Sequence, residues 1–248
     1  MKNILAFSKS EKIILYDKFL KCFYSVFTDI ERIKIPYEDG FLRALVFAAT
    51  IKDTKGFIVA HGGFDNLIEE FYYIFDYFRN LGYTVVAFEG PGQGYTLRKF
   101  GLTLTHDWEK PTKAVLDYLN INDATILGIS LGGYWCLRAA AFEPRITRVV
   151  SYGLVYDFMS VPSDLLRKVT EWFLKKPKLM ESSIRLKMKL DQNHRWSSNQ
   201  WTYRTGAKSV GEVPMHMLAM NQKHMHPERI TQDVLLQIFT YLPVQYII

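Results

Sequence analysis

The 248-residue sequence contains 48% hydrophobic and 23% charged residues, a composition typical of a folded globular protein that excludes a disordered chain. No apolar run approaches the roughly 18 residues that span a bilayer, so no membrane-spanning segment is expected. The first residues return to charge after only a few apolar positions, which is unlike a signal peptide. Two cysteines, Cys22 and Cys136, cannot form a disulfide framework, and we therefore expect a cytoplasmic protein.

The net charge of +6 is concentrated in one region of the chain. Residues 160–228 hold twelve Lys and Arg against six Asp and Glu, whereas the rest of the chain is balanced. A solvated face on an inserted segment is the simplest interpretation, and attraction of anionic substrates or membrane surfaces is the alternative. No nucleic-acid-binding motif accompanies the charge, so no nucleic-acid partner is expected.

The first part of the chain alternates between helical and strand-like patterns. Apolar spacing predicts helices over 10–27, 66–80, 108–118 and 131–142. Strand-like runs cover 32–37, 42–48, 56–61, 83–88, 124–128 and 146–153. The first two strands are joined by a Glu38-Asp39-Gly40 turn, as in an antiparallel pair at a sheet edge. The later alternation predicts βαβ units, and hence an α/β fold with a mostly parallel sheet flanked by helices.

The alternation stops after residue 153 and resumes with a strand pattern at 230–236. Between them, helical patterns cover 163–174 and 181–190, without a strand of comparable quality. We interpret this region as a lid over the carboxyl ends of the strands. The predicted division is an N-terminal helical segment, a core, a helical lid insertion, and a seventh strand with a divergent C-terminus, at 1–28, 29–156, 157–228 and 229–248.

The strongest chemical motif is Gly128-Ile129-Ser130-Leu131-Gly132, which follows an apolar strand and opens a helix. This is the context of a nucleophile elbow, in which Ser130 is raised above the sheet on a sharp turn. Side chains two residues before and after the serine would collide in such a turn, so Gly128 and Gly132 fit it. The motif predicts a positive φ at Ser130, placed beneath the lid.

A second motif, His61-Gly62-Gly63-Phe64-Asp65, follows an earlier strand. An acyl-transfer site needs two backbone N–H donors about 3 Å from the oxyanion. Leu131 is the candidate for one donor, and either Gly63 or Phe64 for the other. We interpret His61 as a structural residue that holds this loop, with a proton shuttle as the alternative.

A third motif, Gly90-Pro91-Gly92-Gln93-Gly94, lacks the Lys-Ser/Thr of a phosphate-binding loop and the spacing of a dinucleotide site. It therefore predicts a tight turn beside the active site and no nucleotide cofactor. No cofactor or metal is expected elsewhere either, because His224-Met225-His226 has no acidic or cysteine partner at ligand spacing.

In this order and spacing, the three motifs resemble the α/β-hydrolase superfamily over residues 30–236, with a lid between the sixth and seventh strands. The resemblance is closest to a bacterial group that includes esterases and the hydrolase of 2,6-dihydroxypseudooxynicotine. It implies a serine hydrolase of small ester, acyl or C–C substrates, with Ser130 as the nucleophile. The alternative is a non-catalytic protein that uses the same fold to bind a ligand or partner.

The resemblance implies that an acid follows the seventh strand and a histidine the eighth. Residues 237–248 contain neither, so we expect a shortened or altered hydrolase that lacks the last strand and helix. A rebuilt triad would use Asp157 as the acid and a histidine of the insertion as the base. Those histidines are His194, His216, His224 and His226. The open sheet edge would expose apolar residues to self-association, namely Ile238, Phe239, Leu242, Ile247 and Ile248.

Overall fold

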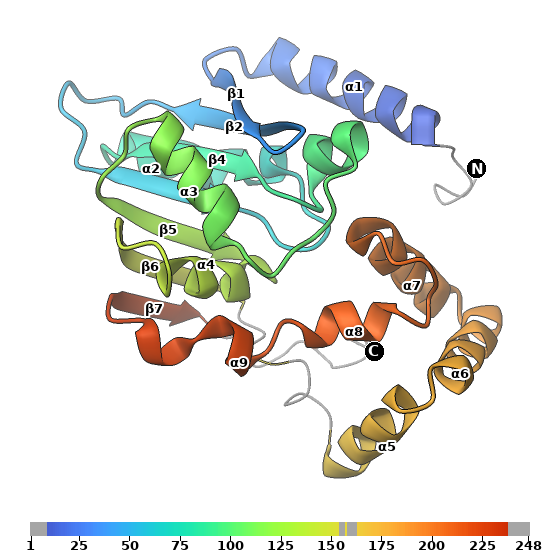
Figure 1. The fold of residues 1–248 in the computed structure, drawn as a ribbon. Helices are drawn as coiled ribbons and strands as arrows, with labels where there is room; N and C mark the ends of the chain where they lie inside the picture. Colours follow the sequence, from blue (N-terminus) through green and yellow to red (C-terminus); the bar gives the residue numbers. More distant parts are fainter. Residues whose placement is uncertain (1–8, 154–156, 158–162, 238–248) are drawn as a thin grey trace.

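The computed structural model describes residues 9–153, 157 and 163–237, which form a seven-stranded sheet with helices on both faces (Figure 1). The strands are β1 (Glu31–Tyr37), β2 (Gly40–Phe47), β3 (Phe57–His61), β4 (Thr84–Glu89), β5 (Ala124–Ile129), β6 (Ile146–Tyr152) and β7 (Asp233–Gln237). Their order across the sheet is β1-β2-β4-β3-β5-β6-β7. The β1–β2 and β2–β4 pairs are antiparallel and the others are parallel, which confirms the predicted fold class.

The helices are α1 (Lys9–Val26), α2 (Tyr72–Asn80), α3 (Glu109–Tyr118), α4 (Gly132–Ala140), α5 (Asp164–Leu174), α6 (Pro177–Leu190), α7 (Gln192–Thr205), α8 (Val213–Leu218) and α9 (Gln222–Met225). Short 3₁₀ helices cover Ile68–Phe71 and Pro227–Arg229, and a π-helix covers Thr96–Phe100. The predicted helix over 66–80 is thus a 3₁₀ turn followed by an α-helix. None of the helices in the described residues is both long and apolar enough to cross a membrane.

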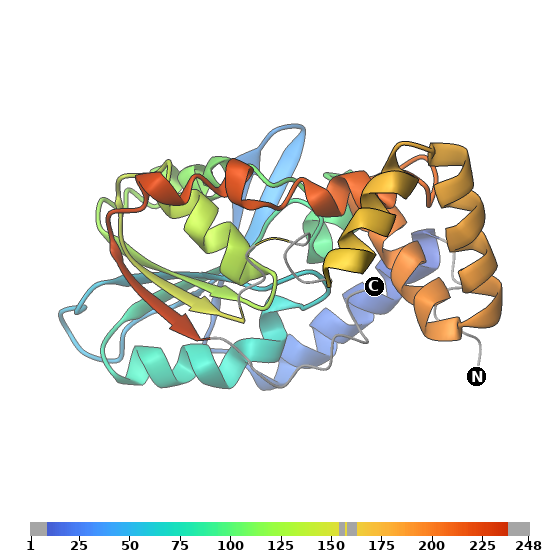
Figure 2. The ribbon, with the colours of Figure 1, turned by 90° about the horizontal axis from the view of Figure 1, so that it is seen from below.

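Two apolar layers cover the sheet because successive residues of a strand face opposite sides. Val59 and Val86 point to the face that α3 and α4 cover, where Trp108 and Trp135 are fully buried. Ile58 and Val85 point to the other face, where they pack with Phe75 of α2. Figure 2 shows α1 and α2 together beneath this second face. The two layers make the sheet a rigid support for the loops at its carboxyl edge.

The described part of the segment between β6 and β7 is mainly helical, with short turns between the helices from α5 to Pro227–Arg229. Figures 1 and 2 place α5, α6 and α7 to one side of the sheet. Ser130 is exposed in the described structure, and the prediction that this segment forms a lid over it stays a prediction. The four-part division of the chain stays a prediction.

The last strand is shifted and more exposed than its sequence pattern indicates. It covers Asp233–Gln237 instead of 230–236, because Ile230 packs against the core and the Gln232 side chain donates a hydrogen bond to the Ala140 carbonyl (2.9 Å) before the strand begins. All five strand residues are exposed, so β7 is an edge strand of the described sheet. The apolar residues at 238–248 lie outside the described residues.

Candidate active site

Ser130 occupies the turn between β5 and α4, with a positive φ of 59° as its motif predicts. Its N–H donates to the Tyr152 carbonyl of β6 (2.7 Å), and its carbonyl accepts from the Gly133 N–H (2.8 Å). A positive φ is uncommon outside glycine and is maintained by such surrounding contacts. The turn therefore presents an exposed serine side chain at the carboxyl edge of the sheet.

The two glycines of the motif are required by close backbone approach. A Cβ atom on Gly128 would overlap the carbonyl group of Gly132. A Cβ atom on Gly132 would lie 2.7 Å from the Gly62 carbonyl oxygen and 3.0 Å from Nδ1 of His61. The sharp turn and the loop after β3 thus press against each other, which only glycine allows at these positions.

The loop after β3 lies directly against Ser130. A Cβ atom on Gly63 would be 2.8 Å from the Leu131 nitrogen and equally close to Cβ of Ser130. The Gly63 N–H itself donates to Oδ1 of Asn66 (3.2 Å). The structure thus brings together the residues predicted for an oxyanion site, Gly63, Phe64 and Leu131, although their role in catalysis stays a prediction.

The glycine-rich loop after β4 contacts the loop after β3 through one buried side chain. Nε2 of Gln93 donates to the carbonyls of Gly62 (2.9 Å) and Gly63 (2.8 Å). Oε1 of the same side chain accepts from the Gly90 N–H (2.9 Å). Gln93 is 1% exposed, so these bonds are shielded from water. The tight turn predicted after β4 therefore also holds the loop after β3 in position.

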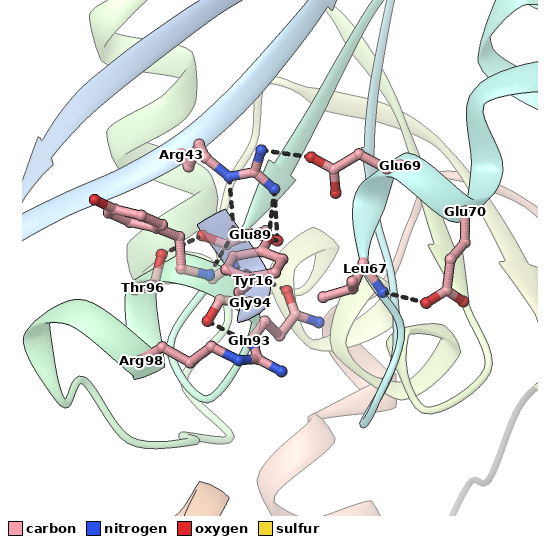
Figure 3. Close-up of polar contacts among 12 residues, drawn as sticks. Tyr16, Arg43, Leu67, Glu69, Glu70, Glu89, Gln93, Gly94, Thr96 and Arg98 are labelled. Atoms are coloured by element: carbon pink, nitrogen blue, oxygen red, sulfur yellow. Dashed lines mark hydrogen bonds and ion pairs between the residues drawn. The ribbon is translucent and has the colours of Figure 1, made fainter. Parts of the chain in front are cut away.

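A buried ionic cluster, not anticipated from the sequence, lies behind this loop (Figure 3). Arg43 of β2 pairs with Glu69 (2.5 Å) and with Glu89 at the end of β4 (2.8 Å). Tyr16 of α1 donates to Glu89 (2.6 Å), and the Tyr95 N–H donates to the other oxygen of that carboxylate (2.7 Å). The only sequence signal was an arginine within the apolar run of β2.

The charge state of the cluster follows from its pairing. Burial is the largest single effect on the pKa of the Glu89 carboxyl and would raise it, but the Arg43 guanidinium and the hydrogen bonds from Arg43, Tyr16 and the Tyr95 N–H together hold that pKa below its usual value. Glu89 is therefore ionised at neutral pH. The cluster joins the elements that flank the two loops, because Glu69 lies in the 3₁₀ turn after the first loop and Glu89 directly precedes the second.

His61 lies fully buried beneath the serine turn. Burial lowers its pKa to about 4, so the ring is neutral at pH 7. Nδ1 lies 3.2 Å from the Gly62 carbonyl, and within the described part of the chain Nε2 has no hydrogen-bond partner. Its ring centroid is 5.1 Å from that of Trp108. These contacts support the structural interpretation of His61 over the proton shuttle.

The C-terminal end of α7 contacts both loops. Trp201 stacks on Phe64 with ring centroids 4.1 Å apart. Arg204 donates to the Gly92 carbonyl (3.0 Å), and the Arg204 carbonyl accepts from the Leu104 N–H (2.8 Å). Burial lowers the pKa of the Arg204 guanidinium to about 10, which leaves it charged at neutral pH. The inserted helices therefore touch the candidate site through α7.

Asp157, the candidate acid, lines an open cavity of about 630 Å³ together with His226 and residues from the end of α8 to the Pro227–Arg229 turn. The imidazole of His226 lies 2.9 Å from Glu228, and that of His224 lies 2.6 Å from the Ala219 carbonyl. His216 is half-buried on α8, and His194 lies on α7. Within the described residues no hydrogen bond joins Ser130 to a histidine, and no group of side chains there could hold a metal ion.

Comparison with known proteins identifies the family to which this fold belongs. The alpha/beta hydrolase fold family matches residues 56–231, and the chain belongs to that family. Among solved structures, 2,6-dihydroxy-pseudo-oxynicotine hydrolase aligns with a TM-score of 0.65 at 20% identity, covering 91% of this chain and 56% of that one. AbyA5 aligns with a TM-score of 0.60 at 18% identity, covering 87% of this chain and 57% of that one. At these identities the likeness concerns the fold alone.

Three fungal relatives carry hydrolase or hydrolyase names. The alpha/beta hydrolase psoB of Aspergillus fumigatus is 32% identical over 205 residues, which are 73% of this chain and 46% of the relative. The hydrolase LUC6 of a Fusarium species is 35% identical over 66% of this chain and 42% of the relative. Hydrolyase poxO of Penicillium oxalicum is 37% identical over 52% of this chain and 34% of the relative. The chain thus spans less than half the length of these relatives.

Proposed function

We propose that the protein is a serine hydrolase that acts on a small-molecule ester, acyl or C–C substrate. The observation that carries the proposal is the geometry of Ser130, an exposed serine with positive φ in a strand-to-helix turn, packed against Gly63. Membership of the family and the hydrolase names of the fungal relatives support the reaction class.

In the proposed reaction, the Ser130 hydroxyl oxygen attacks the substrate carbonyl carbon while a histidine takes the hydroxyl proton. The negative charge that develops on the carbonyl oxygen is stabilised by backbone N–H groups of Leu131 and the loop after β3. Collapse expels the leaving group with the proton held by the histidine, and water then releases the acyl group. This sequence needs no metal or organic cofactor.

The histidine that takes the Ser130 proton has two proposed sources. Within the sequence, the candidates are His194, His216, His224 and His226 of the insertion, with Asp157 as the acid that would orient one of them. A histidine outside this sequence is the other source. Replacing these four histidines by glutamine separates the two sources, because only a base within the insertion predicts that activity is lost.

The test is labelling by a fluorophosphonate probe and hydrolysis of a short-chain p-nitrophenyl ester. Labelling and turnover that vanish in Ser130→Ala, and persist in Ser182→Ala, support an activated nucleophile. Ser182 is the matched control because it is an exposed helical serine whose hydroxyl donates to the Lys178 carbonyl. Turnover that is unchanged in Ser130→Ala would rule the proposal out.

A non-catalytic binding protein is the competing proposal, favoured by the lack of a hydrogen bond from Ser130 to a described histidine. It predicts no labelling of Ser130 in the intact chain.

A cytoplasmic location, expected from the two cysteines, also stays a prediction, and imaging of a tagged protein would test it.

A further inference from the structure

Gln93 is the residue that connects the glycine-rich loop to the loop beside Ser130. Its two amide hydrogens are directed at the carbonyls of Gly62 and Gly63, and its amide oxygen faces the Gly90 N–H. This pattern fixes the amide orientation, because the flipped side chain would place oxygen against two carbonyl oxygens. All three bonds are buried, so losing them would leave polar groups without water.

The bond to Gly63 also determines where the next N–H points. In a trans peptide the C=O and the N–H point in opposite directions, so the Phe64 N–H points away from Gln93. The strand order is β4-β3-β5, which places Gln93 on one side of the loop after β3 and Ser130 on the other. The Phe64 N–H therefore points towards the side where Ser130 lies.

The alternative donor, the Gly63 N–H, is already used. It belongs to the peptide whose carbonyl, on Gly62, Gln93 also holds, and it donates to Asn66 (3.2 Å). An N–H that donates to a neutral side chain is not directed at a developing oxyanion. Both N–H groups point away from Gln93, and Phe64 is the candidate whose N–H is not engaged by Asn66.

We infer that Gln93 is a positioning residue that directs the Phe64 N–H, with that of Leu131, at the carbonyl oxygen of a substrate attacked by Ser130. This inference rests on the proposed hydrolase function. Glu89 in turn holds the loop that carries Gln93. Its carboxylate accepts from the Tyr95 N–H and lies so close to Gly94 that a side chain there would overlap it. The ionic cluster of Figure 3 thus holds the loop that carries Gln93.

The test compares Gln93→Leu and Gln93→Glu with the wild-type chain. The first removes the donors, and the second replaces the donating NH₂ by an acceptor of the same shape. The control is Thr96→Val, which removes a buried hydrogen bond to the Glu89 carbonyl (3.1 Å) in the adjacent turn without touching Gly62 or Gly63. Two readouts are needed, one chemical and one independent of activity.

The chemical readout is the rate at which a fluorophosphonate labels Ser130. Removing one oxyanion donor costs about 10²–10³-fold, and a misdirected donor should cost roughly 10–100-fold. We expect this loss in the maximal labelling rate of both Gln93 variants, with the half-saturating probe concentration and the melting temperature close to those of Thr96→Val. A general loss of folding would instead lower the maximal labelling rate and the melting temperature together.

The second readout is amide hydrogen exchange of the segment from Gly62 to Phe64. We expect exchange to accelerate on the order of 10-fold in the Gln93 variants and to stay unchanged in Thr96→Val, as loss of about 1–2 kcal/mol of local bonding implies. If wild type is not labelled, the proposed function fails and exchange alone decides the role of Gln93. Wild-type exchange in both Gln93 variants, or wild-type labelling rates, would overturn the inference.

Discussion

The rings of Phe64 and Trp201 stack with centroids 4.1 Å apart and an interplanar angle of 28°. Phe64 follows β3 and Trp201 lies on α7, so the contact joins the loop beside Ser130 to the inserted helices. Trp201 is buried, whereas Trp196 on the same helix is 42% exposed. The insertion is therefore attached to the candidate site by one face of α7.

Trp201→Ala should lower the free energy of unfolding by about 3–5 kcal/mol, because it removes a buried aromatic side chain and its stack. Trp196→Ala is the control on the same helix and should cost less than about 1 kcal/mol. Chemical denaturation measures both. Equal losses in the two variants would show that the stack does not fasten α7.

Gly63→Ala should destabilise the protein by about 1–3 kcal/mol and abolish labelling of Ser130, since its methyl group would meet backbone of the serine turn at 2.8 Å. The control is Gly101→Ala, where no atom lies within 4 Å of the added methyl group and only a positive φ is strained. That variant should lose about 1 kcal/mol and keep wild-type labelling. Normal labelling in Gly63→Ala would contradict the proposed packing.

His61 should make stability depend on pH. Burial lowers its pKa to about 4, below the ordinary value of 6.5, so the unfolded chain binds a proton more readily than the folded one. Its contribution is therefore full above pH 6.5 and is lost as the pH falls from 6.5 towards 4, by roughly 3 kcal/mol. In His61→Asn the fall in unfolding free energy between pH 7 and pH 4 should be smaller by that amount. Parallel pH profiles of the two proteins would refute the assignment.

Arg43→Ala should cost about 3–5 kcal/mol, because it leaves the buried carboxylates of Glu69 and Glu89 without their cation. Arg148→Ala removes an arginine whose side chain is 60% exposed and whose partner, Asp123, is also exposed. This control should cost less than about 1 kcal/mol. Urea unfolding of the three proteins compares them directly, and similar midpoints would contradict a stabilising role for the cluster.

We propose that the exposed strand β7 mediates self-association of the isolated chain. Val234, Leu235 and Leu236 are all exposed at this edge of the described sheet. Leu235→Lys places a charge on the edge and should reduce association. Leu190→Lys is the matched control, because Leu190 is 80% exposed on α6, away from the sheet. Sedimentation velocity measures association, and an equal effect of both changes would place the contact elsewhere.

Features formed by neighbouring residues could be predicted from the sequence, including the alternation of strands and helices and the turn around Ser130. All residues of that turn lie within five consecutive positions, so their spacing carries its geometry. The ionic cluster could not be predicted, because Arg43 meets Glu69 and Glu89 only once β2, β4 and the 3₁₀ turn have assembled. The same holds for the bonds from Gln93 to Gly62 and Gly63, which lie 31 and 30 positions away in the chain.

The inserted helices show the limit of periodicity as a signal. The sequence does not predict α7, because Gln192–Thr205 are mostly polar and their aromatic residues do not form a one-sided apolar pattern. Asp191 starts the helix by accepting from the N–H groups of Asn193 and His194. By contrast, α5 has the strongly one-sided apolar pattern from which it was predicted. Its apolar face nevertheless buries no residue in the described structure, so a pattern of this kind does not say what the face will contact.

Because no residue of α5 is fully buried in the described structure, we expect that its sequence can be exchanged with little effect on the folding of the rest of the protein. The sequence of Asp164–Leu174 could therefore vary, in natural relatives or in designed variants, without changing the serine turn. Divergence among relatives should accumulate fastest there, and chimaeras that carry a foreign helix at this position should fold on the unchanged core.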